Sequence, residues 1–303
     1  MINKDFKSIR DLLKTFPNEQ SCIDHLELLR WNGNVISPFD SRSKVYKCKN
    51  NRYRCKRTGK YFNVKTATLF DNTKIELQTW FVAIYLITGH SKGISSVQLS
   101  KDLNVTQKTA WFMLQRIRNC FGIDTDQLDN EVEIDETYVG GKNKNRHASK
   151  KVDKAQGGKS EDKTPVVGMV ERRGKLKAQA VDNMHKDVVN PIIVKAVKTS
   201  AKVYTDEWMG YKSLQRIYDH SFVKHSASEY VRGQIYTNTI EGFWSLLKRG
   251  IIGIYHFASK KHLQKYVDEF VFRYNFRDGN VRLRFNEMLS NTENRLKYKE
   301  LIE

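Results

Sequence analysis

The chain of 303 residues carries 53 Lys and Arg against 34 Asp and Glu, a formal net charge of +19, and 39% of its residues are hydrophobic. This length and apolar content suffice for two or three folded domains, which excludes a disordered tail. The charge predicts a polyanionic partner such as nucleic acid, with a merely soluble or ribosome-associated basic protein as the alternative. The charged start and the short apolar run at 80–88 predict neither a signal peptide nor a bilayer-spanning helix, so we expect a cytoplasmic protein without a membrane partner.

Three of the four cysteines, Cys22, Cys48 and Cys55, lie near the N-terminus, and His25 follows Cys22 at C-x-x-H spacing. In a reducing compartment we do not expect these cysteines to form disulfides. A zinc ribbon needs two paired knuckles that supply four nitrogen or sulfur ligands, but the second pair ends here in Thr58. We therefore expect strands and aromatic residues to hold a ribbon-like segment without metal. A zinc site made of Cys22, His25, Cys48 and Cys55 is the alternative.

A helix-turn-helix pattern occupies residues 95–118. Apolar packing positions predict a first helix over 97–102 and a second that opens at Thr106, a good N-cap residue. We expect the second helix to expose four polar side chains: Gln107, Lys108, Gln115 and Arg116. The first two, near the N-terminus of that helix, suit contacts to base edges or phosphates in a major groove. An ordinary helical hairpin is the alternative.

Two short runs of alternating side chains, 132–137 and 203–206, predict strands that each carry an aspartate. In the first run Asp135 points away from the side taken by Val132 and Ile134, so we expect it to stand clear of the core. Asp206 ends the second run, just before a turn signal. Alone, each aspartate is also explained as a solvated residue at the end of a strand.

Between these strands, residues 142–163 are polar and lysine-rich, and we expect a basic loop that either closes on DNA phosphates or is only solvated. Residues 164–183 then predict a hairpin, and residues 186–198 a helix that is broken or begun again near Pro191.

A third carboxylate is predicted on a helix. Asn238, Glu241, Ser245 and Lys248 share one helical face, and the opposite face is apolar. A capping box that starts at Asn238 is the alternative, in which Glu241 would only accept a hydrogen bond from the amide of Asn238. In the last predicted helix, over 259–277, Glu269 and Arg273 are four residues apart and are expected to form a surface pair.

Carboxylates from two strands and a helix are what a two-metal phosphoryl-transfer site needs. Two divalent ions about 3.5–4 Å apart can stabilise the attacking and leaving oxygens of a phosphodiester, provided that several hard oxygen ligands converge on them. Asp135, Asp206 and Glu241 are the candidate ligands. Lys248, two helical turns after Glu241, is expected to hold a phosphate near them.

The motifs VEIDETYVGGK, VYTDEWMGY and TNTIEGFWSLLKRG, with KGISSVQLSKDLNVTQKTAWFMLQRIR upstream, resemble DDE-type insertion-sequence transposases. More narrowly, the chain resembles the ISXO-two-like group, insertion-sequence group fifteen-ninety-five, from about residue 20 to about residue 280. The resemblance implies an α/β fold, with a ribonuclease H-like catalytic domain (a mixed sheet flanked by helices) preceded by a degenerate zinc-ribbon-like region and a helix-turn-helix. It also implies a site of Asp135, Asp206 and a third residue that is Glu or Asn, so Glu241 and Asn238 both stay open. We prefer Glu241, because a carboxylate is the harder ligand and Lys248 follows it at the spacing of the group's downstream Lys or Arg.

The expected organisation is an N-terminal region (1–78), a helix-turn-helix DNA-binding domain (79–125), a catalytic domain (130–280) and a C-terminal tail (281–303). The resemblance implies two magnesium ions, with manganese as a substitute. It further implies cleavage and strand transfer at the terminal repeats of an insertion sequence, with double-stranded DNA as element end and target. A homodimer or larger assembly would act at the nucleoid. The alternatives are a metal-dependent nuclease without strand transfer, and a DNA-binding regulator or decayed element with an inactive catalytic domain.

Overall fold

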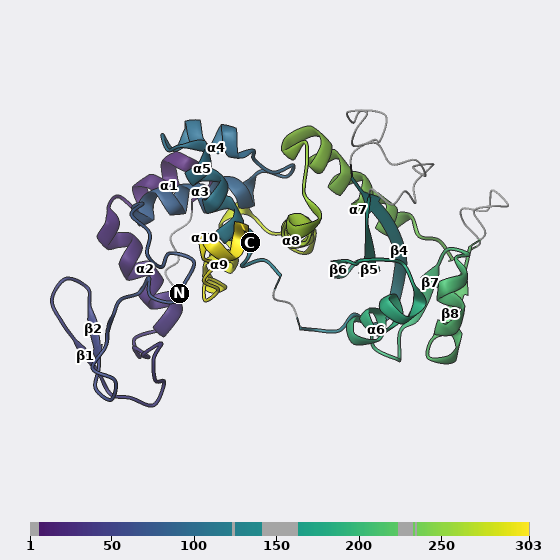
Figure 1. The fold of residues 1–303 in the computed structure, drawn as a ribbon, viewed down its shortest axis with the longest axis horizontal. Helices are drawn as coiled ribbons and strands as arrows, with labels where there is room; N and C mark the ends of the chain where they lie inside the picture. Colours follow the sequence, from purple (N-terminus) through teal and green to yellow (C-terminus); the bar gives the residue numbers. More distant parts are fainter. Residues whose placement is uncertain (1–5, 123–124, 141–162, 224–232, 234, 303) are drawn as a thin grey trace. The chain divides into compact units, whose positions relative to one another are not determined.

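The computed structural model describes residues 6–122, 125–140, 163–223, 233 and 235–302. The chain divides into two compact units, one made of Met1–Ile123 with Asp278–Glu303 and the other of Asp124–Arg277 (Figure 1). The predicted basic loop, apart from Lys163, lies outside the described residues. Within the described ranges, no helix combines the length and apolarity that crossing a bilayer requires.

The first unit is mainly helical. Its helices are α1 (Ile9–Thr15), α2 (Glu19–Trp31), α3 (Leu77–Gly89), α4 (Ser96–Asp102), α5 (Gln107–Arg118), α9 (Val281–Ser290) and α10 (Tyr298–Ile302). The apolar run noted in the sequence lies in α3, whose Phe81, Ala83 and Ile84 are fully buried. Because α3 is apolar on nearly every side, it forms the centre of this unit, and α2, α5 and α9 pack against it.

Both helices predicted between residues 95 and 118 are present as α4 and α5. Thr106 is the N-cap residue of α5, and its side chain accepts a hydrogen bond from the amide of Thr109. Upstream lies a three-stranded antiparallel sheet of β1 (Val45–Lys47), β2 (Tyr53–Cys55) and β3 (Tyr61–Phe62).

The second unit contains a five-stranded mixed sheet. Its strands are β4 (Glu131–Val139), β5 (Thr164–Glu171), β6 (Leu176–Ala180), β7 (Lys202–Thr205) and β8 (Asp219–Phe222), in the spatial order β6-β5-β4-β7-β8. The strand β4 pairs antiparallel with β5 and parallel with β7, so it lies at the centre of the sheet. Both aspartate-bearing strands and the hairpin predicted from the sequence are therefore confirmed.

Helices cover both faces of this sheet (Figure 1). On one face α6 (Lys186–Ala196) and the 3-10 helix η3 (Met209–Arg216) pack on Val132, Ile134 and Val203. On the other face lie α7 (Asn238–Gly250) and α8 (Lys260–Asn275), with the π-helical turn η5 (Ile251–Tyr255) between them. The fold is thus a mixed α/β sheet flanked by helices, as expected. As predicted, α7 buries its apolar face and exposes Asn238, Glu241, Ser245 and Lys248.

Two local predictions are wrong. The helix α6 runs unbroken through Pro191, because Val189 and Ile193 on either side of the proline are fully buried against the sheet. Glu269 and Arg273 do pair, but not at the surface, since their side chains are 0% and 5% exposed. The hydroxyl of Tyr255 also donates to Glu269, so the pair is an internal link between η5 and α8.

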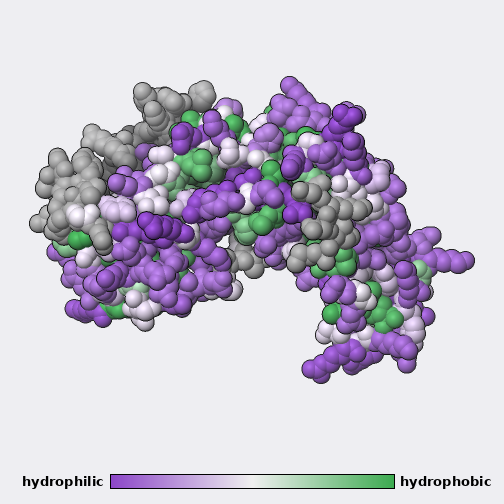
Figure 2. Space-filling model, turned by 180° about the vertical axis from the view of Figure 1, so that it is seen from behind, coloured by the Kyte–Doolittle hydropathy of each residue, from purple (hydrophilic) through white to green (hydrophobic). Residues whose placement is uncertain are grey.

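The view in Figure 2 shows a surface on which hydrophilic residues predominate and hydrophobic patches are small and scattered. Charged residues of both signs, which make up 29% of the chain, contribute to this hydrophilic surface.

Candidate active site

The central strand β4 carries Asp135 on the face covered by α7. Its Oδ2 accepts a hydrogen bond of 3.0 Å from the indole Nε1 of Trp244, in the middle of α7. The residue paired with Asp135 on the neighbouring strand β5 is Gly168. Asp135 is half-buried beneath this helix, so the expectation that it stands clear of the core is wrong. The physical reason is that α7 covers the face to which the alternation directs it.

Asp206 follows directly after β7, and its Oδ1 accepts a hydrogen bond of 3.0 Å from the amide of Trp208. Because β4 and β7 are parallel neighbours, the end of β7 lies beside the middle of β4. Ligand atoms of Asp135, Glu136 and Asp206 all lie within 4.8 Å of one another. The structure therefore brings the two predicted aspartates together and adds Glu136, forming a carboxylate cluster.

Glu136 was missed by the sequence reasoning. Strand alternation places it on the face opposite to Asp135, where its Oε2 accepts a hydrogen bond of 2.9 Å from the hydroxyl of Tyr211. The paired residues of β4 and β7 run only as far as Glu133, so Glu136 lies beyond the stretch where a neighbour closes this side. The carboxylates of Asp135 and Glu136 can therefore both approach that of Asp206, although the two residues start on opposite faces of β4. Glu136 directly follows Asp135 in the sequence, and this adjacency is the signal that could have identified it.

Burial and like charge dominate the electrostatics of the carboxylate cluster. Burial first, and then the negative charges of Glu136 and Asp206, raise the pKa of Asp135 to about 7, although the hydrogen bond from Trp244 opposes the shift. Burial, with the carboxylates around it, also raises the pKa of Tyr211 well above its ordinary value, so this hydroxyl remains a hydrogen-bond donor to Glu136. Three crowded hard oxygen donors are a set that a divalent cation would stabilise.

The two candidates for the third ligand lie in the first turn of α7. Asn238 and Glu241 are both exposed, and neither belongs to the carboxylate cluster. The N-cap residue of α7 is Thr237, so the helix begins one residue too early for a capping box that starts at Asn238. Lys248, in the last turn, is exposed on the same polar face.

A buried carboxylate on β4 holds the start of α7. Glu133 is fully buried and accepts hydrogen bonds from the amides of Thr239 (2.9 Å) and Ile240 (3.2 Å) and from the Thr239 hydroxyl (2.8 Å). The same carboxylate forms an ion pair of 2.8 Å with Nε of Arg172. Glu133 thus attaches the helix that carries Asn238 and Glu241 to the strand that carries Asp135. No local pattern in the sequence indicates this role, because Glu133 and Thr239 are 106 positions apart.

At Gly168 two side chains of α7 approach the sheet so closely that no Cβ atom fits. A Cβ atom at this position would lie 2.5 Å from Cη2 of Trp244 and 3.0 Å from Cδ1 of Ile240. Only a residue without a side chain allows the indole to lie over the strand and donate to Asp135.

We predict that Gly168→Ala displaces Trp244, weakens its hydrogen bond to Asp135 and lowers the stability of the second unit by about 1–3 kcal/mol. Thermal unfolding and near-ultraviolet circular dichroism of the tryptophans measure this. Gly242→Ala is the matched control, since a Cβ on this exposed residue of α7 meets nothing within 4 Å. A loss of stability in the control equal to that in Gly168→Ala would contradict the explanation.

Of the four residues of α5 proposed to read DNA, two are exposed and two are buried. Gln107 and Lys108 are exposed, as expected, and the side-chain amide of Gln107 donates to the Ser96 hydroxyl at 2.8 Å. Gln115 and Arg116 are 0% and 5% exposed, so the expectation that they face solvent is wrong.

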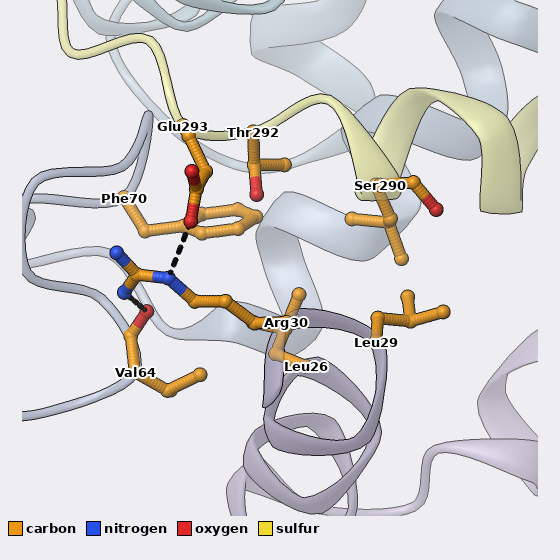
Figure 3. Close-up of a pocket in the computed structure, with 9 residues that line it drawn as sticks. Leu26, Leu29, Arg30, Val64, Phe70, Ser290, Thr292 and Glu293 are labelled. Atoms are coloured by element: carbon orange, nitrogen blue, oxygen red, sulfur yellow. Dashed lines mark hydrogen bonds and ion pairs between the residues drawn. The ribbon is translucent and has the colours of Figure 1, made fainter. Parts of the chain in front are cut away.

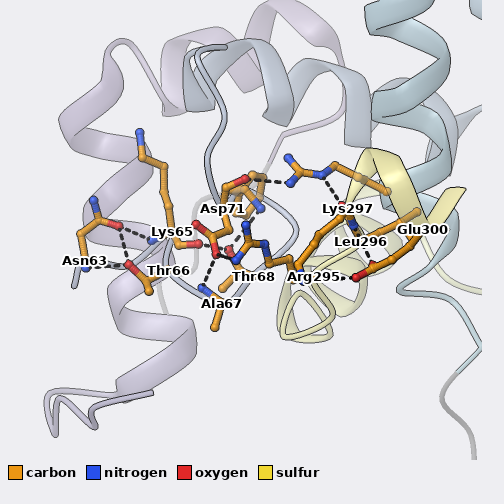
Figure 4. A network of polar contacts seen from close by, with 12 residues as sticks. Asn63, Lys65, Thr66, Ala67, Thr68, Asp71, Arg295, Leu296, Lys297 and Glu300 are labelled. Atoms are coloured by element: carbon orange, nitrogen blue, oxygen red, sulfur yellow. Dashed lines mark hydrogen bonds and ion pairs between the residues drawn. The ribbon is translucent and has the colours of Figure 1, made fainter. Parts of the chain in front are cut away.

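The burial of Arg116 has a clear cause. Its guanidinium donates to the carbonyl oxygens of Leu296 (3.1 Å) and Asp71 (2.7 Å), within a polar network between residues 63–71 and the C-terminal segment (Figure 4). In the same network Arg295 forms an ion pair of 3.0 Å with Asp71. Arg116 is therefore a packing residue of the first unit.

The alternative zinc set is not assembled. Among the described residues, the carboxylate cluster is the only group of three or more potential ligands whose atoms converge. Cys22 and His25 lie buried in α2, where the ring of His25 lies 3.3 Å from the side-chain oxygen of Asn286. Cys48 and Cys55 belong to the region of the small sheet. Their ligand atoms do not converge with those of Cys22 and His25.

The surroundings of Cys55 are hydroxyl groups. Burial raises the pKa of its thiol, but hydrogen bonds with Ser37, Ser43 and Thr58 together outweigh burial and bring it to about 6. Thr58 thus hydrogen-bonds with Cys55 at the position where a complete zinc knuckle would have its second cysteine.

The first unit also has a cavity of about 260 Å³ beside α2, lined by Leu26, Phe70, Thr292 and others (Figure 3). At its edge Arg30 pairs with Glu293 at 3.1 Å and donates to the carbonyl oxygen of Val64 at 2.9 Å. The lining contains one carboxylate, and Arg30 neutralises it, so this cavity has no counterpart of the carboxylate cluster.

Known proteins are similar to this chain. The family model described as ISXO2-like transposase domain matches residues 127–275. The "uncharacterized protein in transposable element ISH50" of Halobacterium salinarum is 28% identical over an alignment of 277 residues, which covers 86% of this chain and 92% of that protein.

Two solved structures are also similar. The Mos1 strand transfer complex has 12% identity over 69% of this chain and 73% of the other, with a TM-score of 0.27. The pre-cleavage Mos1 transpososome has 12% identity over 96% and 99% of the chains, with a TM-score of 0.26. These scores are too low to establish a shared fold.

Proposed function

Because residues 127–275 belong to the ISXO2-like transposase domain family, we propose that the protein is a DDE-type DNA transposase that cuts an insertion sequence at its terminal repeats and joins it to target DNA. The observation that carries this proposal is the convergence of Asp135, Glu136 and Asp206 within 4.8 Å. The mixed sheet with helices on both faces supports a ribonuclease H-like assignment for this unit.

The donor set fits a divalent cation. Asp135, Glu136 and Asp206 offer hard oxygen atoms, and their mutual repulsion is the unfavourable energy that bound cations would relieve. Asp135 and Asp206 would hold magnesium, with manganese as a substitute, and Glu241 or Asn238 would complete the two-metal site. When bound, the ions would activate the attacking oxygen and stabilise charge on the phosphate.

The side chains around the site have distinct tasks in this proposal. Trp244 and the amide of Trp208 fix the two aspartates by hydrogen bonds, and Tyr211 orients Glu136. Lys248, exposed on the polar face of α7, would hold a DNA phosphate. Such fixed polar groups place the reacting phosphate without reorganisation during the reaction.

Two displacements at phosphorus would follow each other. In the first, water loses a proton as its oxygen bonds to the phosphorus at the element end, and the 3′ oxygen leaves with the electrons of its bond and takes up a proton. In the second, that 3′ hydroxyl loses its proton as its oxygen bonds to a target phosphorus, and the target's own 3′ oxygen leaves with the electrons of its bond and takes up a proton. The pair Gln107 and Lys108 on α5 would contact the terminal repeats. Paired ends require a dimer or larger assembly on DNA, and the proposed place of action is the nucleoid in the cytoplasm.

The test uses the full-length protein and a labelled duplex that carries one end of its element with flanking DNA. We expect cutting at the element boundary and joining to a plasmid in the presence of magnesium, and neither step in the presence of a chelator. A duplex with a scrambled end is the control. Binding without cutting would favour the regulator or decayed element, whereas cutting without joining would favour a simple nuclease.

The third ligand can be assigned with three variants on α7. We expect Glu241→Gln to lower both steps by roughly 10²-fold or more, since a metal site contributes several kcal/mol to the stabilisation of the transition state. Asn238→Ala should have a much smaller effect, and Ser245→Ala, on the same exposed face, is the control. The reverse order of effects for Glu241→Gln and Asn238→Ala would assign the role to Asn238.

A further inference from the structure

One face of the three-stranded sheet in the first unit is built from exposed aromatic and cationic residues. Tyr46, Arg54 and Tyr61 are paired in register across β1, β2 and β3, so they form a row on one side. Tyr46 is 42% exposed and Tyr61 52%. On β2 and β3 the residues that alternate with them are buried, namely Tyr53, Cys55 and Phe62, whereas on the edge strand β1 Val45 is half-buried and Lys47 is exposed. The core of this sheet therefore lies on one side only, and the row faces solvent.

Cations lie over the rings of this row. The guanidinium carbons of Arg52 and Arg54 are 5.1 Å and 5.8 Å from the ring centre of Tyr61. The Nζ of Lys44 lies 5.6 Å from the ring centre of Tyr46. Contacts of this kind restrict long side chains before a partner arrives, which reduces the entropy lost on binding.

The charged residues of the segment that carries this face are all cationic. Residues 41–65 contain ten Lys and Arg and neither Asp nor Glu. Among the described residues, only Arg57 and Lys65 of these ten have a carboxylate partner. A solvated surface that serves solubility alone would not need two large exposed rings to order its cations.

We infer that this face, made of Lys44, Tyr46, Arg52, Arg54 and Tyr61, binds the phosphate backbone of duplex DNA. The inference rests on the proposed function and adds a second contact surface to the helix pair α4 and α5. A cation already lies over each ring, 5.1–5.8 Å from its centre, and would compete with an unpaired base for that ring. The guanidinium and ammonium groups are suited to phosphates, which position a protein on DNA independently of sequence.

The test compares Arg54→Gln with Arg10→Gln in the full chain. Arg10 is an exposed arginine of α1 in the same unit, so both variants lose the same charge. Fluorescence anisotropy measures the Kd for the element-end duplex and for a scrambled duplex of equal length, over a series of salt concentrations. We expect Arg54→Gln to weaken both duplexes by the same factor and to reduce the slope of log K against log salt by about 0.9. Arg54→Lys should keep most of the slope.

The possible results separate a failure of this DNA-binding face from a failure of the proposed function. The inference is overturned if Arg54→Gln and Arg10→Gln have the same Kd and slope, or if single-stranded RNA of equal length displaces the duplex more readily than unlabelled duplex does. Circular dichroism checks that Arg54→Gln remains folded, as we expect because Arg54 is exposed. If wild type binds DNA with an Arg54-dependent slope but never cuts, this face stands and the proposed function fails. If wild type cuts and Arg54→Gln changes no slope, the proposed function stands and this face fails.

Discussion

Asp135→Asn and Asp206→Asn are each expected to lower DNA cleavage and strand transfer by about 10³-fold or more, because both steps depend on a metal site worth several kcal/mol. Both carboxylates belong to the cluster whose ligand atoms lie within 4.8 Å of one another. Quantitative gel assays with the element-end duplex measure both steps. Asp182→Asn is the matched control, because its carboxylate is 83% exposed and pairs with Lys260.

The same variants separate a lost metal site from a lost fold. Burial and two neighbouring carboxylates raise the pKa of Asp135 to about 7, so removing its charge relieves repulsion. In a chelator, we therefore expect Asp135→Asn to unfold at the wild-type temperature or above it. Magnesium should raise the unfolding temperature of wild type and of Asp182→Asn but not of Asp135→Asn. A variant that unfolds earlier in the chelator, or that still responds to magnesium, would argue against the assignment.

Glu133→Ala is expected to destabilise the second unit by about 3–5 kcal/mol, the cost of breaking a buried ion pair. The substitution removes the closer of the two carboxylates that pair with Arg172, whose side chain is 9% exposed, and leaves the amides of Thr239 and Ile240 without their acceptor. Because these amides begin α7, the loss should be greatest there. Hydrogen exchange measured by mass spectrometry should show that Glu133→Ala speeds exchange, relative to wild type, more in α7 than in α3 of the other unit.

A double-mutant cycle isolates the interaction. Glu133→Gln keeps the size and an acceptor oxygen but turns an amide group toward Arg172, so it should cost less than Glu133→Ala. Arg172→Met combined with Glu133→Gln should cost less than the sum of the single substitutions. Additive costs would show that the two side chains do not interact, and unchanged exchange in α7 would show that Glu133 does not anchor this helix.

Local pattern located most of the elements of the second unit. Alternation gave the strands of Asp135 and Asp206, and helical spacing gave the buried and exposed faces of α7. The pattern failed where a distant segment decided burial. Gln115 and Arg116 look like surface residues of α5, yet both are buried, and Arg116 donates to the carbonyl oxygen of Leu296 in the C-terminal segment. Glu269 and Arg273 look like a surface pair of α8, yet Tyr255 joins them in the interior.

The sequence by itself determined the charge and the secondary structure around the site, because both follow from residue type and from periods of two and 3.6 residues. The tertiary structure decided that Glu136 joins the two aspartates, that Glu133 holds α7, and that residues 278–303 complete the first unit. Each of these depends on contacts between segments far apart in the chain, and the periodicity of one segment carries no information about which other segment will cover it.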